Sequence, residues 1–320
     1  MTQTATYEDL SHGITVMDTE YMSSDIAALY IVEQEGQVAI IETGTNHSIP
    51  YVQEVLEAKN LNFDDVRYII PTHVHLDHAG GASGLMELCV NAKLVVHPFG
   101  AAHMIDPSKL IAGASAVYGE EKFKSLYGEI KAIKKSRVIE APDGFKLSLN
   151  DREFEFMDTP GHARHHFCIY DKKSNGIFSG DTFGLSYPQL TTKAGRFIFA
   201  TTTPVQFDPD ALLSSIDKIM AKKPDKIYLT HFSEITPTQN VIKQLTDSVK
   251  QFRDIALSSI DNTEDRIEAI NQNIQSYLLQ ILNEMDCDQD VKTQQKIIAF
   301  DSFLNAQGLD FWLKKYHDKT

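Results

Sequence analysis

The chain has 320 residues, of which 42% are hydrophobic, and its formal net charge at pH 7 is −14. This acidic balance disfavours nucleic acid as a partner, because phosphate binding draws on clustered lysine and arginine side chains. The start, MTQTATYEDLSHG, has no apolar signal-peptide core, and no later run approaches the roughly 18 apolar residues of a membrane helix. We therefore expect a cytoplasmic protein that does not contact membranes.

The N-terminal half alternates predicted strands and helices. Residues 28–44, ALYIVEQEGQVAIIETG, read as two strands around a turn, and residues 49–60 as an amphipathic helix. Strands at 66–71 and 92–98 flank a helix that opens near residue 81. From residue 101 to about 137 the pattern is mostly helical, with a break at Pro107, and predicts an excursion over the site.

Strands return in the second half and end in polar residues. They are predicted at 152–161, 165–171, 175–181 and 226–232, and three strand ends present His162, Asp181 and His231. Functional groups in open α/β sheets gather at such strand ends.

After Thr236 the pattern is helical only. Asp261 and Glu264 predict a capping box ahead of a helix, and Gly308 predicts the end of one helix and the start of another. The predicted apolar face consists of Ile267, Ile270, Ile274, Leu278 and Ile281.

The loop PTHVHLDHAGG, residues 71–81, crowds ligand-type side chains together. His73 and His75 are two residues apart and project to the same side of an extended loop, while Asp77 and His78 lie where the chain turns into a helix. Imidazole and carboxylate are ligands that borderline divalent ions such as zinc prefer. The spacing therefore predicts a metal site.

The motifs THVHLDHAGG, DTPGH, SGDTF and YLTHF, in this order, resemble those of the metallo-β-lactamase fold superfamily over about residues 10–235. The resemblance implies an α/β protein with a four-layer αββα sandwich. It implies a catalytic domain at residues 1–235 and a C-terminal helical extension at 236–320. VVHPFGAAHMIDPSKL, TPGHARHH and NAQGLDFWL resemble one branch of the superfamily that carries such an extension.

The resemblance also implies two divalent metal ions, with zinc expected and iron or manganese as alternatives. Its implied ligands are His73, His75 and His162 for the first ion, Asp77, His78 and His231 for the second, and Asp181 as the bridging carboxylate. Two such ions bring the pKa of a bound water from about 15.7 towards 7. Asp77 and His166 are the candidate catalytic residues, His166 as a donor to an oxyanion or leaving group.

The sequence departs from the superfamily pattern in two places. Glu42 stands in IETG where Asp-x-Gly is frequent, and its longer carboxylate is expected to support the metal loop. His165 replaces a glycine beside His166. Several further residues are either pocket groups or ordinary structural and surface residues, namely His97, His103, Tyr187, Arg164, Arg196 and Lys193.

Four functions are compatible with this set. The preferred one is a dinuclear-metal hydrolase of a small ester, thioester or lactone. The alternatives are a phosphodiesterase on a small nucleotide, a mononuclear-iron persulfide dioxygenase, and a non-catalytic binding module. The helices after residue 236 either cover the site or form a subunit interface, and we prefer a homodimer.

Overall fold

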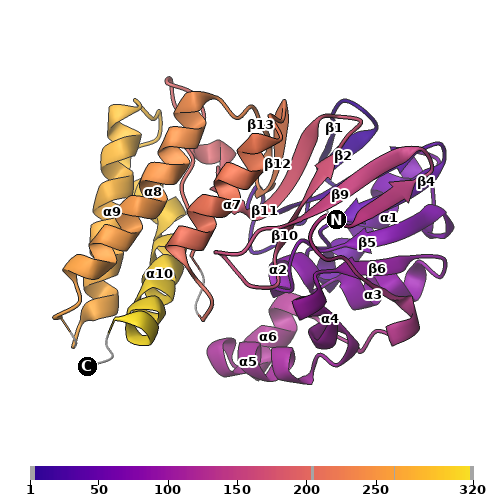
Figure 1. Ribbon diagram of the computed structural model, residues 1–320, viewed down its shortest axis with the longest axis horizontal. Coiled ribbons are helices and arrows are strands. Elements are labelled where there is room, and N and C mark those ends of the chain that lie inside the picture. The colour runs from indigo at the N-terminus through magenta and orange to yellow at the C-terminus, as the bar shows by residue number, and fades with distance from the viewer. Residues whose placement is uncertain (1–3, 203–204, 263, 318–320) are drawn as a thin grey trace. The chain divides into compact units, whose positions relative to one another are not determined.

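The computed structural model describes residues 4–202, 205–262 and 264–317 (Figure 1). The chain forms two compact units. The first comprises the residues up to Asp158, His165–Gly180 and Thr230–Ser233, and the second comprises Thr159–Arg164, Asp181–Leu229 and the chain from Glu234 on. The predicted domain boundary after residue 235 stays a prediction.

A seven-stranded sheet in the order β1 to β7 belongs to the first unit. Its strands are β1 Tyr7–Asp9, β2 Ile14–Asp18, β3 Ala28–Gln34, β4 Gln37–Ile41, β5 Val66–Ile70, β6 Lys93–Val96 and β7 Val138–Glu140. Strands β1 to β4 run antiparallel to their neighbours, and β4 to β7 run parallel. The predicted hairpin is confirmed, with both turn residues, Glu35 and Gly36, at positive φ.

A six-stranded sheet has the order β13-β12-β11-β10-β9-β8. Its strands are β8 Lys146–Leu149, β9 Arg152–Asp158, β10 Phe167–Asp171, β11 Gly176–Leu185, β12 Lys226–His231 and β13 Ser233–Ile235. Tyr30 of β3 contacts Phe178 of β11 edge-on, with ring centroids 5.1 Å apart. The two sheets therefore face one another at this point, which confirms the predicted α/β class.

The first unit contains helices, some of which cover the other face of the first sheet. They are α1 Ile49–Ala58, α2 Leu76–Ala79, α3 Ala82–Leu88, α4 Pro98–Ile105, α5 Ser108–Tyr118 and α6 Glu120–Tyr127, with 3-10 turns η1 Asn46–Ser48, η2 Phe63–Asp65 and η3 Lys135–Arg137. Val52 of α1 and Leu85 of α3 share one buried core with Leu29, Ile40 and Leu94 of the strands. Burial of this apolar face holds the β5–α2 loop at the sheet edge.

Helices dominate the second unit. They are α7 Pro209–Ala221, α8 Gln239–Ser258, α9 Arg266–Glu284 and α10 Val291–Tyr316, with the 3-10 turn η4 Pro188–Leu190. Figure 1 shows α8, α9 and α10 packed side by side, and the predicted helical character after residue 236 is confirmed. Each helix that the structure describes falls short of the length or apolar character that crossing a membrane requires.

Two predicted helix boundaries are wrong. No capping box forms at Asp261 and Glu264, because α9 begins at Arg266, whose buried guanidinium binds Asp310 of α10 at 2.7 Å. The second error is at Gly308, which lies inside the continuous helix α10. A Cβ there would lie 2.9 Å from the Thr202 carbonyl oxygen, so the glycine serves close packing and does not end the helix.

Candidate metal centre

The first unit brings five of the seven predicted ligands onto one edge. His73 and His75 lie in the loop after β5, Asp77 and His78 form the first turn of α2, and His231 ends β12. His73, His78 and His231 are buried. The crowded sequence motif and a strand end 153 positions after His78 thus supply side chains to the same region of the fold.

Asp77, His78 and His231 have the geometry of a metal-binding group. Their ligand atoms all lie within 4.8 Å of one another. Asp77 Oδ2 is 3.4 Å from His78 Nε2 and 3.5 Å from His231 Nε2. Metal–ligand distances of about 2.0–2.1 Å give a tetrahedron whose edges are roughly 3.3–3.4 Å long. The donor set therefore fits a divalent ion.

Hydrogen bonds on the far side of two rings set their tautomers. His78 Nδ1 lies 3.1 Å from Glu42 Oε1, and His231 Nδ1 lies 2.6 Å from the carbonyl oxygen of Ile26. Because both partners only accept, each Nδ1 carries the hydrogen and donates it. The lone pair of each neutral ring then sits on Nε2, the atom that faces Asp77.

Asp77 is held as a carboxylate. Burial favours its neutral form, but in the metal-free chain the positive charge of His78 and hydrogen bonds from the His231 and His78 rings outweigh burial and hold the pKa of Asp77 well below its ordinary value. A divalent ion would take the place of the protons on the two Nε2 atoms. An ionised carboxylate beside two imidazole nitrogens is a ligand set of the kind that divalent ions select.

Glu42 supports the metal loop, residues 71–81, through hydrogen bonds, as its position predicts. Its Oε1 accepts from the hydroxyl groups of Thr72 at 2.5 Å and Thr230 at 3.0 Å, in addition to His78. Its Oε2 accepts from the backbone N–H of Thr72 at 3.1 Å. One buried carboxylate thereby joins β4, the metal loop and β12. Sequence reasoning missed Thr72 and Thr230, because their role depends on a partner far away in the chain.

His73 and His75 face each other closely. His73 Nδ1 lies 3.2 Å from the Thr72 hydroxyl oxygen, whose own hydrogen goes to Glu42, so that His73 Nδ1 donates. The remaining nitrogen, His73 Nε2, is 2.7 Å from His75 Nδ1. At this distance one nitrogen carries a hydrogen and donates it to the other, and because His73 Nδ1 already carries a hydrogen, His75 Nδ1 is the donor and His73 Nε2 the acceptor.

The other two predicted ligands, His162 and Asp181, lie together in the second unit. His162 Nε2 is 3.3 Å from Asp181 Oδ2. His162 Nδ1 is 3.3 Å from the carbonyl oxygen of Thr201, which sets the tautomer in the same way as for His78. Each unit therefore presents imidazole nitrogens next to a carboxylate. The assignment of all seven residues to one centre stays a prediction.

The segment that supports His162 is itself anchored by two helices. The backbone N–H of Thr202 donates to Asn305 Oδ1 of α10 at 2.5 Å, and the Thr202 hydroxyl donates to the Asn305 carbonyl oxygen at 3.0 Å. The backbone N–H of Ala200 donates to the Ser248 hydroxyl of α8 at 2.9 Å. The orientation of one predicted ligand thus depends on the C-terminal helices.

The candidate catalytic residue His166 is fully buried beside the metal loop. Its ring centroid lies 4.9 Å from that of His73. Gly180 makes room for it, since a Cβ at that position, where φ is +49°, would lie 2.4 Å from His166 Nε2. The neighbouring His165 ring lies 5.4 Å from that of His75. His166 acting as a donor to substrate stays a prediction.

Most of the remaining candidates have structural partners. His97 caps helix α4 through Phe99 and contacts Asp158 at 3.1 Å, and the ring centroid of His103 lies 6.4 Å from that of His165. Tyr187 is buried against Phe199. Arg196 donates to Ser186, Lys193 pairs with Asp286 at 2.9 Å, and Arg164 is exposed.

The family model of the metallo-beta-lactamase superfamily matches residues 25–231. With the two sheets and the ligand motif, this match shows that the chain belongs to the metallo-beta-lactamase superfamily. Relatives within it bear hydrolase names, and the chain is a metal-dependent hydrolase of this superfamily.

Three relatives show how far the likeness extends. A metallo-beta-lactamase fold-containing protein of Sulfurisphaera tokodaii is 25% identical over 71% of this chain and 79% of its own length. The crystal structure of that archaeal protein covers 94% of this chain and 99% of its own, with a TM-score of 0.63 and 21% identity. This structural likeness includes the C-terminal helices and confirms the fold.

The other two relatives carry the names of enzymes. An acyl-coenzyme A thioesterase of Homo sapiens is 26% identical over 55% of this chain and 65% of its own length. A probable hydroxyacylglutathione hydrolase of Schizosaccharomyces pombe is 25% identical over 59% of each chain. The match therefore spans less than two thirds of each of these enzymes.

Proposed function

We propose that the chain cleaves a small ester, thioester or lactone with a water molecule activated at a dinuclear metal centre. Thioesters are the first class to test, because one relative is named a thioesterase and another a hydroxyacylglutathione hydrolase. The observation that carries the proposal is the orientation of His78 and His231, whose Nε2 atoms both face the Asp77 carboxylate while their Nδ1 atoms are committed elsewhere.

Two divalent ions, zinc with iron or manganese as alternatives, would be held by seven residues. These are His73, His75 and His162 for one ion, Asp77, His78 and His231 for the other, and Asp181 between them. When bound, the ions would bring the pKa of water from about 15.7 towards 7 and stabilise the negative charge that develops on an acyl oxygen.

The chain's own groups have separate tasks in this reaction. Asp77 stays ionised and accepts a hydrogen bond from the attacking water, which orients the water's lone pair towards the acyl carbon. Glu42 and the Ile26 carbonyl hold His78 and His231 in the neutral tautomer with Nε2 available. His166 would donate to the leaving group or the oxyanion.

Replacement of Asp77 by asparagine tests the proposal. In the metal-loaded protein, Asp77→Asn should lower kcat for a panel of short acyl thioesters by about 10²–10⁴, the range for loss of one positioned catalytic group. Free thiol release reports turnover, and thermal unfolding reports folding. Asp64→Asn, which changes an exposed carboxylate of the same unit, should leave kcat unchanged.

Three outcomes would replace the proposal. If the metal-loaded protein hydrolyses none of the thioesters, esters and lactones, acyl compounds are excluded as the substrate class. Turnover of bis-p-nitrophenyl phosphate far above that of any acyl substrate would establish the phosphodiesterase. One iron per chain, with oxygen consumed in the presence of glutathione persulfide, would establish the persulfide dioxygenase. Gel filtration of the same protein tests the predicted homodimer.

A further inference from the structure

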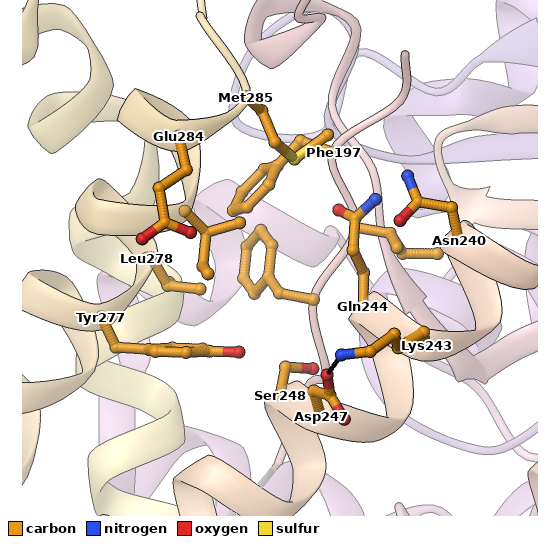
Figure 2. Close-up of a pocket in the computed structure, with 13 residues that line it drawn as sticks. Phe197, Asn240, Lys243, Gln244, Asp247, Ser248, Tyr277, Leu278, Glu284 and Met285 are labelled. Atoms are coloured by element: carbon orange, nitrogen blue, oxygen red, sulfur yellow. Dashed lines mark hydrogen bonds and ion pairs between the residues drawn. The ribbon is translucent and has the colours of Figure 1, made fainter. Parts of the chain in front are cut away.

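The three C-terminal helices pack on one another through apolar side chains. Figure 2 shows Leu278 and Met285 of α9 directed into the space between α9, α8 and Phe197. Helix α10 lies alongside α8 and α9 (Figure 1), and its buried residues recur every three or four positions, at Ile298, Ser302, Asn305, Leu309 and Leu313. One face of α10 is therefore packed within the second unit.

The opposite face of α10 is also apolar, but it is exposed. Phe300, Phe303, Leu304 and Phe311 share this face, because they are three, four and seven positions apart. Phe300 lies nine residues before the buried Leu309, which is about 2.5 helical turns and places the two on opposite sides. The three phenylalanines are 41%, 42% and 37% exposed. A helix that is apolar all round is normally buried all round, so this face lacks a partner within the described chain.

This face carries no negative charge, although the chain as a whole is strongly acidic. Its members are Thr293, Lys296, Ile297, Phe300, Phe303, Leu304, Gln307, Phe311 and Lys314. The formal net charge of the chain is −14, so two copies repel each other over most of their surfaces. A surface without carboxylates is where a second copy can approach at the lowest electrostatic cost.

The two ends of α10 differ in charge. Exposed Asp288 and Asp290 outnumber Lys292 at the start of the helix, whereas Lys314 and Lys315 lie in its last turn. If two copies of α10 ran in the same direction, each end would meet an end of the same charge. In an antiparallel pair, the acidic start of one helix lies beside the basic end of the other. Charge complementarity therefore favours antiparallel packing.

The size of the face fits a reversible dimer. A whole phenylalanine presents about 150–250 Å², so at about 40% exposure each of the three presents about 60–100 Å². Two copies then bury about 360–600 Å² of aromatic surface, and the other members of the face bring the total to the order of 1,000 Å². This area reaches the lower limit for a specific interface and stays below the standard of about 1,600 Å².

We propose that α10 forms the interface of a symmetric homodimer, in which the exposed faces of two copies pack antiparallel. Phe303 lies at the middle of Val291–Tyr316 and therefore near the twofold axis, where it meets the same residue of the second copy. The proposal assigns a defined surface to the homodimer that the sequence led us to expect. It does not depend on the proposed reaction.

Sedimentation equilibrium of the metal-loaded, full-length protein tests this interface. The unaltered protein should form dimers with a Kd of about 1–100 µM. Phe303→Asp places a carboxylate near the axis in both copies and should weaken the dimer by about thirtyfold or more. Phe300→Asp should do the same, so the test survives a folding failure of either variant. Phe99→Asp, at a phenylalanine of α4 that is 69% exposed, should leave the Kd unchanged.

Charge reversal tests the antiparallel arrangement. Asp288→Lys and Lys315→Glu should each weaken the dimer about threefold. The double variant should recover the original Kd, because the attraction between the two ends returns with reversed signs.

Other results would overturn the proposal. A protein that stays monomeric up to about 1 mM has no such interface. A dimer that both Phe303→Asp and Phe300→Asp leave intact forms through another surface, and a double variant as weak as the single ones excludes the antiparallel arrangement. A monomer that co-sediments with phosphatidylserine vesicles would assign the face to a membrane surface instead.

Discussion

Glu42→Gln should weaken metal binding without removing any predicted ligand. The Glu42 carboxylate accepts four hydrogen bonds, three at Oε1 and one at Oε2. A glutamine supplies only one acceptor oxygen. In the better orientation, the amide oxygen replaces Oε1 and the NH₂ group faces the Thr72 backbone N–H. Two donors then face each other without an acceptor, which costs about 1–3 kcal/mol of folding stability. The opposite placement leaves three donors without their acceptor and costs more.

Glu42→Gln should also lower the affinity for zinc, and by more than the loss of folding stability alone would cause. Loss of the carboxylate behind His78 removes the charge that fixes Nδ1–H and strengthens Nε2 as a donor atom. Changes of this kind cost about 10–100-fold in metal affinity. Competition with a chromophoric chelator measures the zinc Kd, and urea unfolding of the metal-free protein measures stability. Glu57→Gln, at an exposed carboxylate of α1, is the control.

The result that would refute this reasoning is a zinc Kd within about twofold of the unaltered protein in folded Glu42→Gln. Glu42→Asp tests whether the length of the side chain matters. Aspartate keeps the charge and tolerates the φ of +65° at this position, but its shorter side chain withdraws the carboxylate from Thr230 and His78. An intermediate loss of zinc affinity is expected.

Other predictions follow from packing, titration and metal binding. Gly308→Ala should destabilise the protein by about 1–3 kcal/mol, because the new Cβ would meet the Thr202 carbonyl oxygen. Gly113→Ala, in open space on helix α5, should stabilise the protein by about 0.5–1 kcal/mol. Thermal unfolding measures both changes. Burial raises the pKa of Cys89 from 9.0 to about 12, so the unfolded thiol ionises first and stability present below pH 9 is lost as the pH rises towards 12. The loss is about 1.4 kcal/mol per pH unit, and Cys89→Ala should abolish this part of the slope in urea titrations. Removal of metal with a chelator should lower Tm, and added zinc should restore it in proportion to ln(1 + [zinc]/Kd).

Local sequence patterns predicted most of the fold. Apolar runs and turn residues located the β3–β4 hairpin, the β5–α3–β6 sequence and the helices after residue 236, because each of these signals is complete within a short window. The metal loop was predictable for the same reason, since four of its ligand-type residues lie within six positions.

Features that depend on distant contacts could not be predicted in this way. Gly308 looks like a helix end until Thr202 is placed against it, and the start of α9 depends on Arg266 meeting Asp310. The same limit applies at the metal loop. The role of Thr230 depends on Glu42, 188 positions away, and no pattern near either residue indicates the pairing.

The hydrogen bonds around residues 200–202 connect the C-terminal helices to one of the predicted metal ligands. Asn305 fixes Thr202, and the adjacent Thr201 carbonyl fixes the His162 ring. A transplant of the β-sheet portion alone, or an exchange of α10 for that of a relative, would keep every predicted ligand in the sequence and yet remove the support of the His162 ring. We therefore expect substitutions in α10, which leave all predicted ligands unchanged, to alter the orientation of His162.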